Sequence, residues 1–391
     1  MSGAHAERAH ARLSASGSKR WLSCTPSAAL EDNFPDTTSE FAREGTAAHE
    51  LSELYLQLHI EQITKAAFNR RLGKFKKENE FYTQEMDDFV NSYVDFVIER
   101  INEAQALSSD AITLLEQRLD FSEWVPDGFG TGDVVIISDG IMEIIDLKYG
   151  KGVPVSAEEN TQMRLYALGA LNQFGMLYDV EKIVMTIVQP RLDSISSDEM
   201  DAEALFDWAE DYVKPKAEMA MNGEGEFVAG DHCRFCKAKA VCRERAEENL
   251  KMAKYDFQEP KLLTIEEIAE ILVKAEELQK WAKDVSEYAL DQAENHHVKF
   301  PGWKLVEGRS NRKYTDEEAI REKLAKNYEP DAFLKTSLFT LTNLEKSIGK
   351  KQVENLIGEF IIKPSGKPTL VAESDKRPEI NSTASAVADF S

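Results

Sequence analysis

The sequence predicts a mixed α/β fold in which a mixed β-sheet is flanked by helices. Three observations support this prediction. Apolar residues recur with helical spacing in much of the first 110 residues, three β-rich runs follow between residues 112 and 147, and another helical stretch and a short β-rich run come next. Helices followed by three strands, a helix and a strand are typical of a mixed α/β domain.

Two helices are predicted before the strands. The first spans residues 40–62 and the second spans residues 84–107. Each has one apolar face, because its apolar residues recur three or four positions apart. These faces consist of Ala47, Leu51, Leu54 and Leu58 in the first helix and of Phe89, Tyr93, Phe96, Val97 and Ile101 in the second. Residues 1–20 are small and polar, so we expect a frayed N-terminal segment.

The predicted strands include a tight hairpin. The first strand covers residues 112–121, and two further apolar runs, residues 134–137 and 141–147, flank the dipeptide Asp139-Gly140. Asp-Gly between β-rich runs favours a two-residue type I′ turn, which fixes the register of the strands on either side.

The rest of the chain is predicted to be mostly helical. We expect helices over residues 159–175, 198–222 and 264–295 and a strand over residues 182–190. The last helix opens with a capping box formed by Thr264 and Glu267, and its apolar stripe can pack on its own domain or on a partner helix. Further along, the pattern predicts helical pieces within residues 338–358 and a loose hairpin over residues 360–371.

Four regions follow from this pattern: an N-terminal helical part (1–110), a sheet core (111–222), a cysteine region (223–250) and a C-terminal α+β extension of helices and a hairpin (251–391). The chain has 391 residues and a net charge of −23, which argues against a basic surface that coats nucleic acid. It has neither a long apolar run nor an N-terminal signal peptide. We therefore expect no membrane association and a cytoplasmic location.

The register of the hairpin has a chemical consequence. It places Val135 opposite Ile144 and Asp133 opposite Asp146, and directly opposed residues have Cβ atoms about 4.5–5.5 Å apart. Two carboxylates this close repel each other. Either both point into water, or a divalent cation lies between them. Lys148 lies on the same face as Asp146, because side chains alternate along a strand.

A third carboxylate and two glycines lie close to this pair in the predicted sheet. Glu116 is in the preceding strand and could project onto the same face, although a lone glutamate in a strand is usually a solvated edge residue. Gly130 and Gly132 precede Asp133 and permit either close approach of a ligand or a bulge.

These residues resemble the signature of the restriction-endonuclease-like PD-(D/E)XK nucleases. The matching elements are Glu116, the segment Gly-Thr-Gly-Asp133 and the triplet Asp146-Leu147-Lys148. The chain is more narrowly similar to the RecB-type branch, which adds a Gly-x-x-x-His element and a Gln-x-x-x-Tyr element, here Gly45 to His49 and Gln162 to Tyr166. The segment LSASGSKRWLSC resembles the N-terminal segment of RecB-type nuclease domains, and the chain up to its C-terminal part, including GKPTLVAESDKRPEI, resembles RecB-like nucleases encoded by phages and prophages.

The resemblance implies a metal-dependent deoxyribonuclease with a restriction-endonuclease-like core. The implied metal ligands, for Mg²⁺ or Mn²⁺, are His49, Asp133, Asp146 and the Leu147 carbonyl. The implied catalytic residues are Glu116, Asp133, Asp146, Lys148, Gln162 and Tyr166. Lys148 would position the attacking water, and Glu116 would stabilise the site or reach a second metal. Gln162 and Tyr166 would orient Lys148 or contact the DNA backbone.

The four cysteines predict a second cofactor. Cys233, Cys236 and Cys242 are clustered, whereas Cys24 lies about two hundred residues upstream. Buried free thiols and a zinc site are both open interpretations of the spacing. The AddB-type pattern, with one cysteine before the nuclease core and three after it, implies a [4Fe–4S] cluster. The segment is also locally basic, which indicates either a solvated helix or a DNA-facing patch formed by Arg234, Lys237, Lys239, Arg243 and Arg245.

The expected function is therefore DNA hydrolysis in phage-type replication, recombination or degradation. The resemblance favours an exonuclease that acts on single-stranded DNA or on free ends. It also implies a helicase or recombination protein as a possible partner, and the host cytoplasm as the location if the protein is phage-encoded. One alternative is a nuclease fold that binds DNA or recruits partners without cleavage. Another is that residues 250–391 dominate as a partner-recruitment region.

Overall fold

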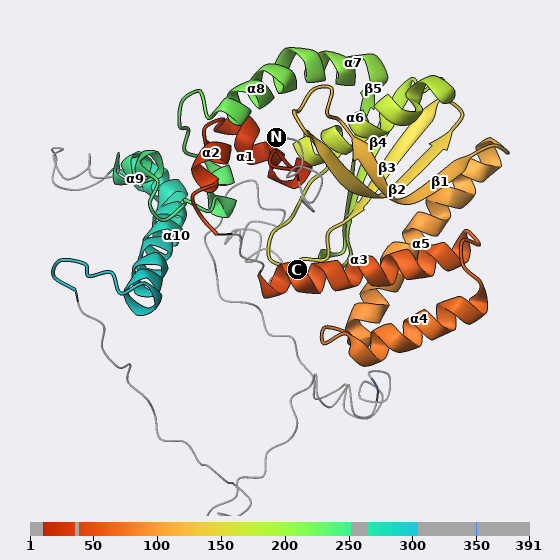
Figure 1. The fold of residues 1–391 in the computed structure, drawn as a ribbon, viewed down its shortest axis with the longest axis horizontal. Helices are drawn as coiled ribbons and strands as arrows, with labels where there is room; N and C mark the ends of the chain where they lie inside the picture. The colour runs from red at the N-terminus through yellow and green to blue at the C-terminus, as the bar shows by residue number, and fades with distance from the viewer. Residues whose placement is uncertain (1–10, 36–38, 252–263, 304–348, 350–391) are drawn as a thin grey trace, which may run out of the picture. The chain divides into compact units, whose positions relative to one another are not determined.

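The fold is built on one open, five-stranded mixed sheet flanked by helices (Figure 1). The computed structural model describes residues 11–35, 39–251, 264–303 and 349. The chain divides into two compact units, Met1–Leu305 and Val306–Ser391, and the architecture described here is that of the first. The strands follow one another across the sheet in chain order and are β1 (Ile112–Asp120), β2 (Phe129–Ser138), β3 (Ile141–Leu147), β4 (Lys182–Gln189) and β5 (Ser194–Asp201).

The hairpin prediction is confirmed in both turn and register. Strands β2 and β3 pair antiparallel, with Val135 opposite Ile144. Asp139 and Gly140 have φ values of 49° and 74°, as a type I′ turn requires at both central positions. Strand β1 pairs antiparallel with β2, β4 runs parallel to β3, and β5 pairs antiparallel with β4.

Helices cover both faces of the sheet (Figure 1). Alternate residues of β2 enter different cores: Val135 packs in one and Val134 in the other. The first core is closed by α1 (Ser18–Ser23), α2 (Ser27–Glu31), α6 (Thr161–Phe174), α7 (Ala202–Trp208) and α8 (Lys214–Asn222), with a short π-helical turn (Ala209–Val213) between the last two. The second is closed by α3 (Glu40–His59), α4 (Lys65–Glu78) and α5 (Gln84–Leu107).

Three features differ from the sequence prediction. Helix α4 was not predicted, because only Phe68, Leu72 and Phe75 mark its inner face among many charged residues. The predicted helix over residues 198–222 is wrong at its start, since residues up to Asp201 form β5, an edge strand whose largely polar sequence hides its period-2 pattern. The N-terminal segment is not frayed from residue 11 onward, because Leu13, Trp21 and neighbouring residues are buried in the first core.

Helices α9 (Arg243–Leu250) and α10 (Ile265–Asn295) follow the cysteine region. The capping box at the start of α10 is confirmed, since Thr264 and Glu267 bond each other's backbone N–H groups. Apolar positions of α10, including Ile265 and Leu272, are exposed among the described residues. The predicted pieces within 338–358 and 360–371 lie outside the described residues. No helix of the described part has both the length and the apolar character needed to cross a membrane.

Candidate metal centre and cysteine cavity

Three acidic residues lie level with one another on three adjacent strands. The pairs on either side of Glu116 place it opposite Asp133 on β2. The last recorded pair of the hairpin, Val134 with Ile145, places Asp146 of β3 next to Asp133 on its other side. The sheet therefore brings together all three carboxylates that the sequence singled out, and their mutual repulsion has to be offset by the surroundings.

Glu116 has an unusual backbone conformation for a strand residue. Its φ is 46°, in the left-handed region, which costs a residue other than glycine about 1–3 kcal/mol. Leu114 and Leu119 pack against the same core, although an odd separation of five would place them on opposite faces of a regular strand. The left-handed residue resets the alternation. Backbone strain of this kind persists where the surrounding structure enforces it, often at functional sites.

Helix α3 adds His49 to the acidic group. Its Nδ1 lies 3.1 Å from Asp133 Oδ1. Burial opposes a charge on this imidazole, but the negative charge of Asp133 and the hydrogen bond to it raise the pKa of His49 to about 9. One ligand atom from each of His49, Glu116 and Asp133 lies within 4.8 Å of the others, and in the described part of the chain no other three cysteine, histidine or acidic residues approach so closely.

Asp146 stands beside this trio rather than in it. Its Oδ2 lies 2.9 Å from Lys148 Nζ, and its Oδ1 accepts a long hydrogen bond of 3.4 Å from Gln162 Nε2. Lys148 Nζ donates to Gln162 Oε1 at 3.0 Å, and Gln162 Nε2 also reaches the Tyr166 hydroxyl at 3.1 Å. Helix α6 thus holds Lys148 against Asp146 with the two residues that the sequence placed on one helical face. Leu147 contributes its backbone N–H, which donates to Asp133 Oδ2 at 2.7 Å.

One buried polar atom beside this group has no hydrogen-bond partner among the described residues. It is the hydroxyl of Tyr93, on α5, and burial, followed by the charges of Asp133 and Asp146, raises its pKa. An unpartnered buried polar atom is costly, so a water or a ligand fits beside it. Carboxylate oxygens and one imidazole are a donor set that suits Mg²⁺ or Mn²⁺.

The two glycines near Asp133 serve protein packing. A Cβ at Gly130 would lie 2.5 Å from Tyr166 Cε1, and one at Gly132 would lie 2.7 Å from Leu119 Cδ1. The approach that Gly130 permits is therefore that of helix α6, which brings Tyr166 over β2. Both glycines pair in register with β1, so neither of them marks a bulge.

The four cysteines line one small cavity, together with Arg20, Lys239 and Arg245. All four are free thiols, and burial raises the pKa of Cys24, Cys233 and Cys236, the last to about 12. No three of the sulfurs lie within 4.8 Å of one another. Tetrahedral zinc, about 2.3 Å from each sulfur, would bring them to about 3.8 Å. The cavity brings the N-terminal and post-core cysteines together as the sequence expected.

Comparison with known proteins gives a family but no activity. A family model described as "Protein of unknown function (DUF2800)" matches residues 10–378. The chain belongs to the DUF2800 family. Among solved structures it is similar to one titled "Crystal structure of SSO0001", with 16% identity over 41% of this chain and 78% of that chain and a TM-score of 0.20. A TM-score this low gives no support for a shared fold.

One part of the predicted basic patch is wrong. The Arg245 side chain is only 2% exposed, and it donates to Glu277 and Asp284 of α10. Lys239 Nζ also lies 2.8 Å from Asp284. Arg245 therefore ties the cysteine region to α10, and it faces neither solvent nor DNA. The sequence did not show that Arg245 is buried, because its partners Glu277 and Asp284 lie more than thirty residues further along the chain.

Proposed function

We propose that this protein is a metal-dependent DNA nuclease that hydrolyses phosphodiester bonds. The observation that carries the proposal is the ligand set of His49, Glu116 and Asp133, which lies beside the Asp146–Lys148 pair. An isolated acidic cluster would be weak support. A cluster that can hold a cation and that lies beside a fixed ammonium group supplies the two features that metal-dependent phosphodiester hydrolysis uses, an activated water and positive charge for the phosphoryl oxygens.

The residues of the site have distinct roles in this proposal. His49, Glu116 and Asp133, with Asp146, would hold the cation. A bound divalent cation lowers the pKa of water and offsets the negative charge that develops on the phosphoryl oxygens. His49 has to give up its proton to become a ligand, so cation binding would release a proton at neutral pH.

Lys148 supplies the fixed positive charge. Gln162 accepts one of its hydrogen bonds and Asp146 neutralises it from 2.9 Å, so the ammonium group stays beside the carboxylates. From there it can hold the attacking water or a phosphate oxygen. Tyr166 and Gln162 act on Lys148 through the hydrogen bonds of α6, so we assign them as positioning residues rather than groups that contact the reacting atoms.

The proposed occupant of the cysteine cavity is a [4Fe–4S] cluster, and zinc is the alternative. One cysteine that comes before the sheet core and three that come after it line one cavity, which is the arrangement that the sequence resemblance associates with a cluster. A cluster there would join the end of α1 to residues 233–242. The two segments are already linked nearby, because Glu31 of α2 accepts a hydrogen bond from the backbone N–H of Lys237. It would stabilise the fold by closing a long loop, as a structural metal does.

The preferred activity is exonucleolytic, on single-stranded DNA or free ends in phage-type DNA metabolism, because the sequence elements resemble RecB-like nucleases. The test compares linear single-stranded, linear double-stranded and closed circular DNA in Mg²⁺ or Mn²⁺. We expect degradation of linear DNA only, and a loss of about 100-fold or more in Asp146→Asn. The matched control, Glu123→Gln, removes an exposed carboxylate three residues after the end of β1 and should keep full activity.

Two outcomes would overturn parts of the proposal. Equal degradation by wild type and Asp146→Asn would remove the catalytic assignment. Binding of DNA without cleavage in either metal would favour the alternative of a nuclease-like fold that binds DNA or recruits a partner.

A further inference from the structure

Helix α4 concentrates positive charge in an otherwise acidic protein. Its 14 residues include six basic side chains and one acidic side chain, Glu78, so the helix carries a net charge of +5 in a chain of −23. The basic residues are Lys65, Arg70, Arg71, Lys74, Lys76 and Lys77. An acidic protein that handles DNA needs local positive charge of this kind.

Three of these residues form a row on the outer face of the helix. Phe68 and Phe75 are buried on the inner face. Arg70, Lys74 and Lys77 are exposed and follow one another with spacings of four and three residues, which places them on one side, opposite the phenylalanines. Seven helical steps separate Arg70 from Lys77, so the row is about 10 Å long at 1.5 Å per residue.

The side chains of the outer row make few interactions that would stabilise the fold. Lys76, by contrast, lies 2.9 Å from Asp87, and hydrogen bonds to Tyr82 and Asp87 raise its pKa. Lys74 has only a weak contact within the helix, 3.8 Å from Glu78. Among the described residues Arg70 and Lys77 make no ion pair. Exposed lysines and arginines are often merely solvated, so position has to decide between that interpretation and a binding role.

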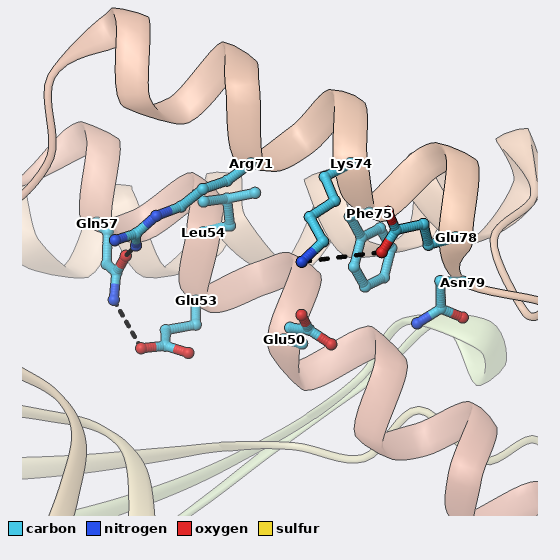
Figure 2. A pocket seen from close by; sticks show the side chains of 9 residues that line it. All are labelled: Glu50, Glu53, Leu54, Gln57, Arg71, Lys74, Phe75, Glu78 and Asn79. Atoms are coloured by element: carbon cyan, nitrogen blue, oxygen red, sulfur yellow. Dashed lines mark hydrogen bonds and ion pairs between the residues drawn. The ribbon is translucent and has the colours of Figure 1, made fainter.

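Position favours a binding role. Helices α3 and α4 enclose an open cleft of about 520 Å³, lined by Glu53 and Gln57 on one side and Arg71 and Lys74 on the other (Figure 2). Glu53 is one helical turn after His49 on α3, so the two side chains lie on the same side of that helix. The basic helix therefore lies across this cleft from α3, the helix that supplies His49 to the metal centre. Glu50, Glu53 and Glu78 also line the cleft and repel phosphate, so a polyanion would follow the outer row, in which Lys74 stands at the edge of the cleft, and would not enter the cleft.

We propose that the row formed by Arg70, Lys74 and Lys77 binds the phosphodiester backbone of the DNA strand that enters the metal centre. The proposal rests on the proposed nuclease function. At about 3.4 Å of helix axis per phosphate in one strand, the row spans about three phosphates. The contacts are with the backbone, so they carry no sequence preference.

The test measures DNA binding without cleavage. Wild type and the variant Arg70→Ala/Lys74→Ala/Lys77→Ala are titrated in EDTA against a fluorescent single strand and against a blunt hairpin duplex, over a range of salt concentrations. Alanine favours helix, so the variant should keep α4, and circular dichroism checks this. Three lost phosphate contacts should reduce the slope of log K against log salt by about 2 for a single strand.

The control changes the same amount of charge elsewhere. Lys214 is half-exposed and pairs with Glu210 in the preceding π-helical turn, and Lys280 and Lys283 are exposed and pair with Glu276 and Glu287 of α10. Their triple alanine variant should keep the wild-type slope. An unchanged slope in the α4 variant, or an equal reduction in both variants, would overturn the proposal. A reduced slope with the single strand alone would assign the row to single-stranded DNA, and a reduced slope with both substrates would assign it to either form.

Failure of this proposal is separable from failure of the nuclease proposal. Hydrolysis of a small phosphodiester that is too short to reach α4 should be unchanged in the α4 variant and lost in Asp146→Asn. Binding that depends on α4 in a protein that cleaves nothing would leave this inference standing and remove the catalytic one.

Discussion

Glu116→Gln should stabilise the metal-free protein, and only at neutral and alkaline pH. Burial, followed by the charge of Asp133, raises the pKa of Glu116 to about 7 from its ordinary 4.5. An acid with a raised pKa prefers the folded state when it is protonated, so its ionisation costs stability as pH rises between these two values. Glutamine keeps the shape of the side chain and removes the ionisation.

The size of the effect follows from the same two values. At about 1.36 kcal/mol per pH unit, the 2.5 units between 4.5 and about 7 give a ceiling of about 3.4 kcal/mol. Glu116 is reached by solvent, which screens its charge, so we expect about 1–2 kcal/mol at pH 8 and almost nothing at pH 4.5. His49 also titrates, and its contribution is present below 6.5 and lost as pH rises through about 9. This contribution of His49 is present in both the wild type and Glu116→Gln, so it largely cancels in the difference between their free energies of unfolding.

The assay is urea unfolding in EDTA at pH 4.5, 6, 7 and 8 for wild type, Glu116→Gln and the exposed control Glu123→Gln. A saturating cation should reverse the order, because ligand at 100 times its Kd stabilises the wild type by about 2.7 kcal/mol and the variant by much less. A difference between wild type and Glu116→Gln that does not change with pH would refute the reasoning, and so would an equal change in the control.

Three further predictions concern packing and the cysteine region. Gly130→Ala should destabilise the fold by about 1–3 kcal/mol, because its Cβ meets the buried Tyr166 ring, whereas Gly45→Ala, which meets nothing within 4 Å, should not; equal thermal stability of the two variants would contradict this. Wild type purified without oxygen should be brown and contain iron, and Cys242→Ser should lose both, whereas a colourless wild type with stoichiometric zinc would assign the cavity to zinc. Arg245→Met should weaken the attachment of α10 by roughly 2–3 kcal/mol, seen as faster amide exchange over residues 265–295; unchanged exchange would show that the buried ion pairs do not hold the helix.

The local chemistry of the sequence predicted the hairpin and its acidic pair well. Asp139-Gly140 determines a turn that few other dipeptides favour, and the turn determines the register of every residue after it. The prediction that Asp133 and Asp146 are neighbours follows directly. The positions of Gln162 and Tyr166 on one face of α6 were also predictable, because residues four apart on a helix share a face.

Features that depend on distant partners were not predictable. The left-handed backbone of Glu116 and the approach of His49 depend on how α3 packs on the strands. In the sequence, Tyr93 is one residue of an apolar helical face, and the pattern does not show that its hydroxyl is buried without a partner. A phenol among aliphatic residues does indicate a polar group that needs a partner in the core. Arg245 looked exposed by composition and is buried by α10. In each case the deciding contact lies far away in the sequence.

The account depends most on the claim that the acidic group holds a divalent cation. The most direct measurement is calorimetric titration of Mn²⁺ into metal-free wild type and Asp133→Asn at pH 8. We expect saturable binding by the wild type, with proton release, and an affinity at least about 10–100-fold weaker in the variant. Binding of equal affinity by both proteins would contradict the claim, as would no binding by the wild type.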